Sequence, residues 1–587
     1  MQTVAVRAPE ATGTGPKESV LVALVLGISA LTYIATLNYS FVYDDYVVVV
    51  NNPLVHSWSY LPTLLAGKAW VEAGGHTAAG LVNYYRPGFM IWSLLNYSLF
   101  GTHAWGYHLL TVLVFLADVA VLYLIVRQLT GSVRTAALAS AIFGVHPVHV
   151  EAVAWFNGGE PLYCLPFFVG FYAYLRAREG NAAKWMALSS VCFVLGLLCK
   201  EFTAMLPVLI FLHLWLFGEP GGSTGAAKLA RACLWMIPFA VISAVYLVIR
   251  VRVLQGFGHH HIDLPIATMA MTWPSLWWFY LKKLVLPIGL SGFYDATYYD
   301  HFDVVHVLLP SLALIAFAAG IWYWGRKAQN PLIPFCGLWM IVPFFPLLDL
   351  AIFNRGDILH DHYLFLPSVG FIILVALALE KVAAPTGDPT AWPKPLVVVT
   401  VVLIGVLCLG TAYASSFWEN NLTAFSRGVQ IAPHSVLARN NLANELLERK
   451  KFDDARAQYK EVLKQNPSYW LSMYNLGYLE YRAGNYADAE RYFLKSADMN
   501  ANDSDTFLYM GLAMYKNGEI ADAISAVRYA IQLSPEKQGY HFALGYMRQQ
   551  QGQCDAARAE FQQELRFNPG STTAQQQMNA PCPTPAK

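Results

Sequence analysis

The chain has 587 residues, of which 56% are hydrophobic and only 13% are charged. Soluble domains carry about 25% charged residues, so a single soluble globular body is excluded, and so hydrophobic a chain is not disordered. The charge is uneven, because residues 415–587 hold 36 charged residues among 173, whereas residues 1–414 hold only 41. This break predicts a polytopic membrane domain followed by a soluble domain. The formal net charge of +1 gives no basis for binding nucleic acid.

The predicted membrane helices begin close to the N-terminus. Residues 20–37 are uncharged and lack a small-residue cleavage site, so they predict a first membrane helix and no cleaved signal peptide. Two further apolar segments do not fit a simple crossing: 87–100 is short, and 268–290 carries Lys282 and Lys283 in its middle. We predict that both form interfacial or re-entrant helices. About eleven crossings are therefore expected, the first followed by apolar segments at 106–126, 135–153, 161–177, 183–199, 203–217, 231–251, 304–325, 331–351, 362–380 and 395–414.

The loop charges orient this membrane domain, which we place at residues 19–414. When residues 1–18 are cytoplasmic, eleven crossings place 13 of the 21 basic residues inside and 13 of the 20 acidic residues outside, as the positive-inside rule requires. The odd number of crossings then puts the soluble part on the extracytoplasmic side, together with an outer loop at 38–105. We therefore expect a multi-pass protein with a cytoplasmic N-terminus.

The soluble part has an internal repeat. Pro433, Pro467, Pro535 and Pro569 lie at multiples of 34 residues from one another. Period and small-residue positions resemble the tetratricopeptide repeat, in which small residues let paired helices approach closely. We predict a linker or docking helix at 415–435, four repeats forming an α-solenoid at 436–572, and a disordered tail at 573–587. The aligned small residues are Ala443, Gly477, Gly511, Gly545, Ala455, Ala489, Ala523 and Ala557.

Two adjacent carboxylates, Asp44 and Asp45, begin the first outer loop. Burial and mutual repulsion raise the pKa of one member of such a pair. Neighbouring side chains point in different directions, so one carboxylate can face a site while the other supports the loop. The alternative is a solvated start of the loop.

A second cluster, HPVHVEAVAW, covers residues 146–155. His146 precedes a proline and is predicted to cap a short outward helix that carries His149 and Glu151. Two histidines and a carboxylate are metal-ligating types, but the spacing does not fix a third strong ligand. Histidines held by hydrogen bonds at the interface explain the pattern equally well. The sequence therefore requires no metal or other cofactor, and a divalent metal is the weaker alternative.

Several further charged residues map to the same outer edge of the membrane domain. Cations there can bind a lipid phosphate or a phosphate leaving group, or they can simply anchor headgroups. Cys554 and Cys582 lie in the soluble part and could form a disulfide in an oxidising compartment. The outer-edge charged residues are Arg86, Lys200, Glu201, Arg250, Arg355, Asp361 and His362.

Several strings carry a resemblance that spans nearly the whole chain. They are FVYDDYVVVVNNP at 41–53, YYRPGFMIWSLLNYSLFGTHAWGYHL at 84–109, HPVHVEAVAW at 146–155, LCKEFT at 198–203 and YLFLPSVGF at 363–371. With the repeats, they resemble the transmembrane and tetratricopeptide repeat-containing family of protein O-mannosyltransferases. The resemblance implies an all-α fold, namely a GT-C-type membrane helical bundle followed by the repeat solenoid.

The resemblance also implies an activity. Members transfer a sugar, usually mannose, from a dolichyl or other polyprenyl phosphate to a Ser or Thr hydroxyl, with inversion at the anomeric carbon. Asp44 is then the general base, and Asp45 orients it or the acceptor. The residues implied to bind the donor phosphate are Arg86, His146, His149, Lys200 and Arg355. The residues implied to position them are Glu151, Glu201, Asp361 and His362.

The chain also departs from the family pattern. No basic residue follows the histidine cluster in Asn157–Pro161, and Asp361-His362 stands where relatives often have an acid–arginine pair. Four repeats are few, which favours a prokaryotic member in a bacterial inner membrane with periplasmic repeats, and the endoplasmic reticulum membrane is the eukaryotic counterpart. Two other functions stay open: a non-catalytic scaffold that recruits partners through its repeats, and a transferase that modifies a glycolipid.

Overall fold

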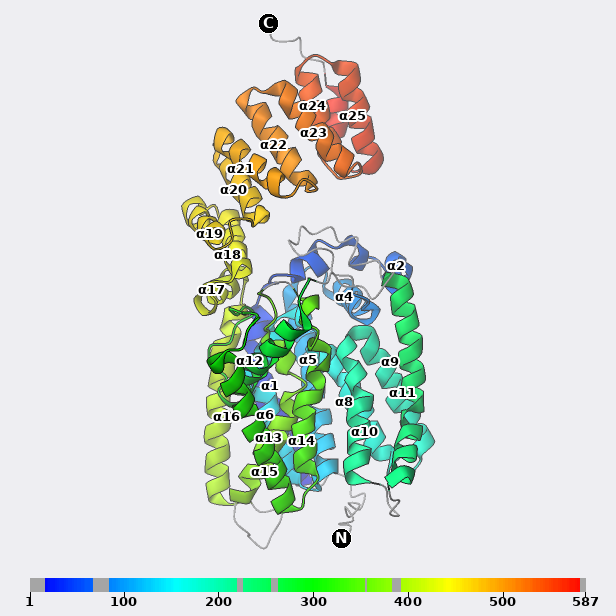
Figure 1. Ribbon diagram of the computed structural model, residues 1–587. Coiled ribbons are helices and arrows are strands. Elements are labelled where there is room, and N and C mark those ends of the chain that lie inside the picture. Colours follow the sequence, from blue (N-terminus) through cyan, green and yellow to red (C-terminus); the bar gives the residue numbers. More distant parts are fainter. Residues whose placement is uncertain are drawn as a thin grey trace. The chain divides into compact units, whose positions relative to one another are not determined.

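The structure is a computed structural model that describes residues 16–66, 84–218, 225–254, 262–353, 356–382 and 392–580. The regular elements of these residues are all helical, which confirms the predicted all-α class. The chain divides into two compact units, Met1–Ala432 (unit 1) and Pro433–Lys587 (unit 2) (Figure 1). The charge break in the sequence therefore lies close to a structural boundary.

The helices of unit 1 fall on the predicted apolar segments, and each of the eleven segments contains one. Many of them run roughly along one common direction in Figure 1. The shorter α4 (Pro87–Phe100) and the helix α12 (Ile266–Val285) cover the two segments predicted to be interfacial. The helices on the eleven segments are α1 (Pro16–Tyr33), α5 (Ala104–Thr130), α6 (Val133–Val145), α8 (Glu160–Ala177), α9 (Ala182–Cys199), α10 (Leu206–Phe217), α11 (Gly225–Leu254), α13 (Leu309–Ala328), α14 (Leu332–Ile341), α15 (Ser368–Val382) and α16 (Lys394–Ser415).

Fewer of these helices than predicted are long enough to cross a membrane unaided. Within the described residues, six pass by length and composition, and a seventh does if α6 and the following turns to Ala154 form one bent span. The chain is thus a multi-pass membrane protein, with six or seven of the expected eleven crossings supported by helix length. Prolines explain part of the shortfall, because Pro343 and Pro346 convert the end of α14 into a 3₁₀ turn at Val342–Leu347.

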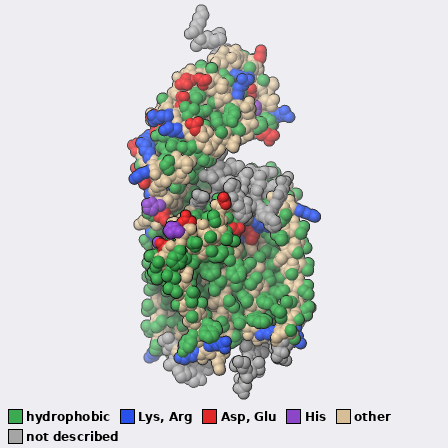
Figure 2. Space-filling view, viewed as in Figure 1, with side chains coloured by type: hydrophobic (Ala, Val, Ile, Leu, Met, Phe, Trp, Pro, Cys, Tyr) green, Lys and Arg blue, Asp and Glu red, His purple; other side chains and the backbone are tan. Residues whose placement is uncertain are grey.

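The surface of unit 1 matches a lipid environment. Large apolar side chains such as Leu195, Val241, Ile315 and Val406 are exposed on four different helices. Figure 2 shows a broad hydrophobic surface on unit 1, and Lys and Arg side chains line its lower edge. Such an apolar belt is what the hydrocarbon core of a bilayer contacts.

The bend after α6 builds one end of unit 1. The helix stops at Val145 and turns by 52° into a 3₁₀ turn, Pro147–His149, and the short α7 (Val150–Ala154). Nδ1 of His146 accepts a hydrogen bond from the N–H of Val148 at 3.4 Å, so His146 caps this turn as predicted. A left-handed Gly159 (φ 68°) then directs the chain into α8. The bend brings polar side chains to the end of the bundle.

Unit 2 consists of four antiparallel helix pairs, in agreement with the four predicted repeats. The predicted small positions lie in the seam of each pair, where a Cβ on Gly477 would meet the Phe493 ring at 2.8 Å and one on Gly511 would meet Val527 at 2.7 Å. The aligned Ala455, Ala489, Ala523 and Ala557 are fully or almost fully buried. The pairs are α18 (Val436–Glu448) with α19 (Phe452–Gln465), α20 (Trp470–Ala483) with α21 (Tyr486–Met499), α22 (Ser504–Asn517) with α23 (Ile520–Leu533), and α24 (Tyr540–Gln550) with α25 (Cys554–Phe567).

The end of the chain corrects one expectation. Residues 573–587 were expected to be disordered, but a further helix, α26 (Thr572–Asn579), follows the repeats. Ser571 caps this helix, Ala574 is fully buried, and Gln549 donates a 3.2 Å hydrogen bond to the carbonyl oxygen of Gln577, so a stretch without an apolar period is still held by specific contacts. Residues 581–587 lie outside the described residues. Cys554 is disulfide-bonded, and Cys582 lies outside the described part of the chain.

Candidate active site

The Asp pair lies in a turn that the surrounding packing holds. Tyr43 adopts a positive φ of 56°, a conformation that costs a non-glycine residue about 1–3 kcal/mol and persists only when its surroundings impose it. Its N–H donates a 2.8 Å hydrogen bond to Oδ1 of Asn421, the first residue of α17 (Asn421–Ile431). Its ring packs against Trp155 and Phe293. The turn is therefore fixed by segments from three distant parts of the chain.

The two carboxyl groups of the pair have different environments. Asp45 is fully buried, and its oxygens accept hydrogen bonds from the N–H of Val42 at 3.1 Å and of Asn157 at 2.9 Å. Asp44 is only half-buried, and its carboxylate accepts no hydrogen bond from any described residue. The geometry therefore assigns anchoring to Asp45 and leaves Asp44 accessible.

Burial shifts the pKa of both groups upward. It raises the pKa of Asp44 to about 7, where the nearby Asp357 adds to the shift and His360 opposes it. It raises the pKa of Asp45 to about 8, although the two backbone N–H groups lower it. A carboxylate with a pKa near neutrality is suited to accept a proton from a substrate hydroxyl.

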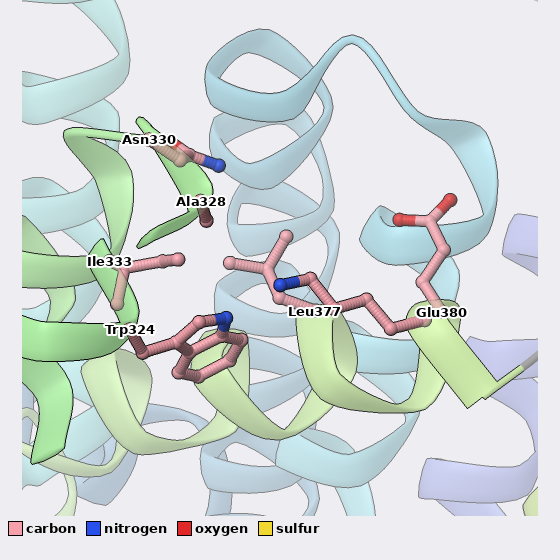
Figure 3. A pocket seen from close by; sticks show the side chains of 7 residues that line it. Trp324, Ala328, Asn330, Ile333, Leu377 and Glu380 are labelled. Atoms are coloured by element: carbon pink, nitrogen blue, oxygen red, sulfur yellow. The ribbon is translucent and has the colours of Figure 1, made fainter. Parts of the chain in front are cut away.

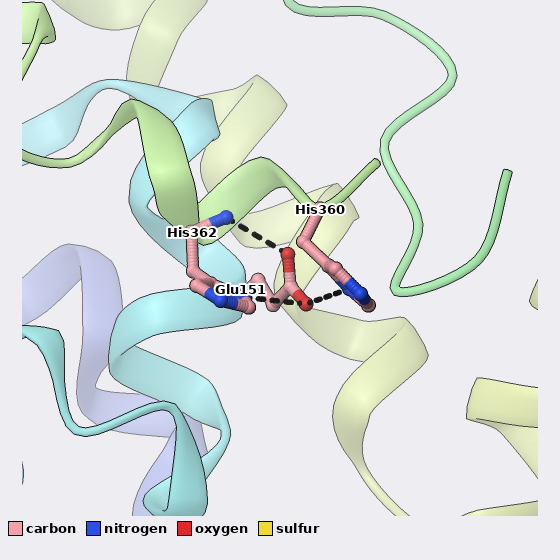
Figure 4. Close-up of side chains that lie close together, drawn as sticks. All are labelled: Glu151, His360 and His362. Atoms are coloured by element: carbon pink, nitrogen blue, oxygen red, sulfur yellow. Dashed lines mark hydrogen bonds and ion pairs between the residues drawn. The ribbon is translucent and has the colours of Figure 1, made fainter. Parts of the chain in front are cut away.

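Glu151 lies at the centre of a cluster with two histidines, shown in Figure 4. Its Oε1 atom is 3.0 Å from Nδ1 of His362 and 3.4 Å from Nδ1 of His360. Its other oxygen, Oε2, accepts a 2.9 Å hydrogen bond from the backbone N–H of His362. Burial alone would lower the pKa of His360, but the carboxylates of Asp357 and Glu151 raise it. Glu151 thus holds His360 and His362, and not the phosphate-binding residues that it was predicted to position.

His146 and His149 do not join this cluster, which corrects their predicted role in phosphate binding. Both are buried, and Nε2 of His146 lies 3.2 Å from the carbonyl oxygen of Leu284. The ring nitrogens of His149 are taken up by the carbonyl oxygen of Phe143 at 2.8 Å and the hydroxyl of Ser368 at 2.9 Å. With their polar atoms satisfied inside the bundle, these histidines serve the fold.

Lys200 is also committed to a protein partner. Its ammonium forms an ion pair with Oε1 of Glu160, and it donates a 3.3 Å hydrogen bond to the carbonyl oxygen of Gly158. The side chains of Lys200 and Glu160 are 9% and 1% exposed, so the pair is buried. A buried carboxylate of this kind needs a cation beside it. The predicted phosphate-binding role of Lys200 is therefore not favoured by its contacts.

Arg86 shares an acidic partner with a second arginine. Its guanidinium contacts Oε2 of Glu201 at 2.9 and 3.0 Å, and Arg250 contacts Oε1 of the same carboxylate at 2.7 Å. Two guanidinium groups thus share one carboxylate, and Glu201 positions both. Arg86 also lies 4.0 Å from the ring centroid of Tyr84, and Tyr84 is in electrostatic reach of Asp44. Tyr84 is thus coupled electrostatically to both Arg86 and Asp44.

The last predicted site residues lie on either side of His360. Asp361 is buried, and its carboxylate accepts hydrogen bonds from the Tyr294 hydroxyl at 2.7 Å and the N–H of Ser291 at 3.1 Å. Burial, with the nearby Glu151 carboxylate, raises the pKa of Asp361. Asp361 thus fixes the loop at Ser291. Arg355 lies outside the described residues.

Four residues near the site were absent from the predicted set of catalytic, binding and positioning groups. His360 and Glu160 were visible as polar residues beside predicted motifs, and Arg250 as a cation at an outer edge. Asp357 carried no signal, because a single acid in a loop is ordinarily solvated. His360, Glu160 and Arg250 acquire their roles from contacts with residues distant in the sequence, whereas Asp357 contacts His360, three residues along the chain.

A separate cavity of about 240 Å³ lies at the far end of α15, shown in Figure 3. Trp324, Asn330, Glu380 and Lys381 are among its lining residues. Glu380 is already held by Ser132 at 2.9 Å and by Arg134 at 3.3 Å. The carboxylate of Glu380 is therefore already paired. Glu380 lies near the C-terminal end of α15, whereas Asp361 precedes its N-terminal end, so this cavity is not part of the Asp44 site.

Comparisons with protein families match both parts of the chain. Residues 86–249 match the Dolichyl-phosphate-mannose-protein mannosyltransferase family, a segment that contains Arg86, Glu151 and Glu201 but not the Asp pair. Residues 440–504 and 510–572 match the tetratricopeptide repeat, which agrees with the helix pairs of unit 2. The repeats are also similar to the crystal structure of MamA protein, at 23% identity over 25% of this chain and 80% of that chain, with a TM-score of 0.24.

Curated relatives extend the similarity over both parts at once. A protein O-mannosyl-transferase of Caenorhabditis elegans is 25% identical over 76% of this chain and 63% of its own length. Protein O-mannosyl-transferase TMTC3 of Mus musculus is 26% identical over 76% of this chain and 51% of its own, and TMTC1 of Homo sapiens is 24% identical over 80% and 57%. The chain thus spans between about half and two thirds of these relatives. With a mannosyltransferase segment followed by tetratricopeptide repeats, the chain is related to the protein O-mannosyl-transferase family at about a quarter sequence identity.

Proposed function

We propose that this protein is an inverting glycosyltransferase that moves a sugar, in the first place mannose, from a polyprenyl or dolichyl phosphate to Ser or Thr hydroxyls of a polypeptide. One observation carries the proposal. Within one turn, Asp45 is locked by two backbone N–H groups while Asp44 is half-buried and accepts no hydrogen bond from a described residue. This division of roles is what a positioned general base requires. The match of residues 86–249 to a mannosyltransferase family supports the same conclusion.

In the proposed reaction, Asp44 takes the proton of the acceptor hydroxyl. The hydroxyl oxygen attacks the anomeric carbon in line and forms the new glycosidic bond. The bond between the anomeric carbon and the phosphate oxygen breaks, the lipid phosphate leaves, and the configuration at the anomeric carbon inverts. Asp45 holds the turn through Val42 and Asn157, so that the base stays oriented. A positioned base contributes about 10²–10⁴-fold, and the remaining acceleration has to come from alignment and from stabilising the departing phosphate.

Arg86 and Arg250 are the groups that we assign to that phosphate. They share one carboxylate, Glu201, which holds both guanidinium groups in place. Lys200 is instead paired with the buried Glu160 carboxylate. Arginine also offers parallel N–H donors that match phosphate oxygens. The proximity of Tyr84 to both Arg86 and Asp44 supports a single site for donor and base.

We further propose that the repeats present the acceptor on the extracytoplasmic side. The chain leaves α16 beside the Asp turn, where Ser40 donates a 2.9 Å hydrogen bond to the carbonyl oxygen of Glu419. The first residue after the membrane helices is therefore at the same end of unit 1 as Asp44. This end is opposite to the basic turns of α5 and α13, which the positive-inside rule assigns to the cytoplasm. Eleven crossings, a bacterial inner membrane and periplasmic repeats complete the proposal.

The test is transfer of labelled mannose from a synthetic polyprenyl phosphate mannose to a co-reconstituted acceptor protein. The wild-type chain should add hexose to Ser or Thr, and Asp44→Asn should lower the rate by about 10²–10⁴-fold while the protein elutes and melts as the wild type does. Full transfer by Asp44→Asn would overturn the assignment of the base.

Deleting residues 433–587 separates the remaining functions. A protein transferase should lose transfer to polypeptide, whereas a transferase acting on a glycolipid should keep its turnover. A scaffold without catalytic activity would transfer no sugar in any variant and would be indifferent to Asp44→Asn.

A further inference from the structure

We propose that Glu151, His360 and His362 form a binding site for a divalent transition-metal cation of the Zn²⁺ type. One ligand atom from each residue lies within 4.8 Å of the other two. Among the described residues, these three form a group of potential metal ligands that meets this distance. Two imidazoles and one carboxylate are a known zinc ligand set, which leaves a further position for water or substrate.

The distances within the cluster fit such an ion. Bonds of about 2.0–2.2 Å in a tetrahedral site place neighbouring ligand atoms about 3.3–3.5 Å apart. Oε1 of Glu151 lies 3.4 Å from Nδ1 of His360 and 3.0 Å from Nδ1 of His362. Small side-chain adjustments therefore suffice to accommodate the cation, because the three atoms already converge in Figure 4.

The three atoms are also buried without a well-formed hydrogen bond. Oε1 of Glu151, Nδ1 of His360 and Nδ1 of His362 make none within the described residues, although the nitrogens approach the carboxylate closely. Native proteins satisfy the great majority of buried polar atoms. Three orphaned atoms that face one another in one small volume are explained at once by a shared cation.

A carboxylate lies beside the opposite edge of one histidine and faces that of the other. Nε2 of His360 lies 3.3 Å from Oδ1 of Asp357, whereas Nε2 of His362 lies 3.9 Å from Oε1 of Glu160, which is too long for a hydrogen bond. A carboxylate in the position of Asp357 fixes the tautomer and orientation of a metal-bound histidine. Oε2 of Glu151 is likewise occupied by the backbone N–H of His362 at 2.9 Å, which leaves Oε1 free to bind.

A cavity of about 10 Å³ lies directly beside the cluster and provides room for a further ligand. Glu151 and His360 line it, together with Tyr43 and Trp155. This volume is about that of one water molecule, so a water could complete the coordination of the ion. The cavity therefore lies between the cluster and the residues that precede Asp44, Val42 and Tyr43.

Metal uptake by the full-length protein tests the proposal. The chain is purified without a histidine tag, stripped with a chelator and titrated with Zn²⁺ and Co²⁺, and bound metal is measured by mass spectrometry and by Co²⁺ absorption. The histidine triplet 259–261, which lies outside the described residues, is replaced by serine in every sample. We expect one tightly bound ion per chain, and each of Glu151→Gln, His360→Gln and His362→Gln should abolish stoichiometric binding.

Two matched variants sharpen the measurement. Asp357→Asn keeps all three ligands but removes the carboxylate beside Nε2 of His360, and it should weaken metal affinity by about 10–100-fold. His541→Gln removes a similar histidine–carboxylate pair in the repeats, where Nδ1 lies 2.7 Å from Glu560, and it should leave metal uptake unchanged.

Three results would overturn the proposal: no ion retained by the parent chain, an ion retained by all three ligand variants, or His541→Gln lowering uptake as much as they do. If a ligand variant fails to fold, X-ray absorption of the Zn²⁺-loaded parent decides. It should show nitrogen and oxygen ligands with imidazole scattering, and sulfur ligation or water alone would contradict the site. The measurements need no donor or acceptor, so their outcome is independent of the transferase activity proposed above.

Discussion

Oδ1 of Asp45 accepts a 2.9 Å hydrogen bond from the backbone N–H of Asn157, a residue 112 positions away. This bond joins the turn that carries Asp44 to the segment that follows Glu151. The two carboxylates of the Asp pair therefore differ in their contacts. Asp45 is bonded to the backbone of the fold, whereas Asp44 is half-buried and accessible.

Substituting Asp45 should consequently affect stability. Asp45→Ala removes the acceptor of two backbone N–H groups and leaves a small void, so we expect a loss of about 2–4 kcal/mol. Asp45→Asn keeps one acceptor and should cost about 1 kcal/mol. Thermal unfolding of the detergent-purified chain should rank Asp45→Ala lowest, then Asp45→Asn, with Asp44→Asn close to the wild type. A melting temperature lowered more by Asp44→Asn than by Asp45→Ala would reverse the roles.

The activity should fall in mildly acidic solution. The pKa of Asp44 is raised to about 7 by burial and by Asp357, against the effect of His360, and Asp45 and Tyr84 are the other ionisable neighbours. A general base works only when deprotonated, so kcat/KM should decrease about tenfold per pH unit below pH 7 and level off above it.

Asp357→Asn tests whether Asp44 controls the acidic limb of the kcat/KM profile. Removing a negative neighbour stabilises the ionised form of Asp44 and lowers its pKa, so the acidic limb of the kcat/KM profile should move to lower pH. The comparison of the two profiles is the measurement. An unchanged acidic limb, or one displaced to higher pH, would mean that a group other than Asp44 controls it.

Much of the fold was predictable because its causes are local. Every apolar segment contains a helix, since hydrophobicity over a stretch of this length commits the backbone to internal hydrogen bonds. The 34-residue period located the repeats because Gly477 and Gly511 mark places where two helices touch. The number of helices long enough to span the membrane was harder to predict, because hydropathy does not show where Pro343 and Pro346 interrupt a helix.

The candidate site was predictable only in part. The Asp pair and Glu151 stood out because adjacent or clustered polar residues at a membrane edge are unusual. The partners of Glu151 were predicted wrongly: His146 and His149 are close in sequence, but the 52° bend after α6 turns them into the bundle. The histidines that do reach Glu151 come from a loop 211 residues further along, and no spacing in the sequence encodes that contact.

Lys200 offers a test of whether a cation at the site is structural. Lys200→Met leaves the buried Glu160 carboxylate without its partner and should destabilise the protein by about 3–5 kcal/mol. Adding Glu160→Gln removes the stranded charge, so the double variant should recover most of the melting temperature. Donor KM in the double variant should stay near that of the wild type. A large rise in donor KM with normal thermal stability would instead assign Lys200 to the phosphate.

The repeat seam makes a final prediction about unit 2. A Cβ at Gly511 would lie 2.8 Å from the backbone oxygen of Ala523 and 2.7 Å from Val527. Because a backbone atom has little freedom to move away, Gly511→Ala should destabilise the α22–α23 pair by about 1–3 kcal/mol, despite the higher helix propensity of alanine. Hydrogen exchange of these two helices in the full-length chain should accelerate about 5–150-fold, since 1.4 kcal/mol corresponds to a factor of ten.

Gly570→Ala is the matched control for that variant. Gly570 also belongs to unit 2, but a Cβ there would meet no atom within 4 Å and its φ is not positive. Its substitution should therefore leave exchange in α22 and α23 unchanged. If the repeats present the acceptor, Gly511→Ala should also reduce transfer to polypeptide, whereas Gly570→Ala should not. Equal exchange rates in the two variants would show that the seam tolerates a methyl group, and the close approach of α22 and α23 would then be less rigid than these distances require.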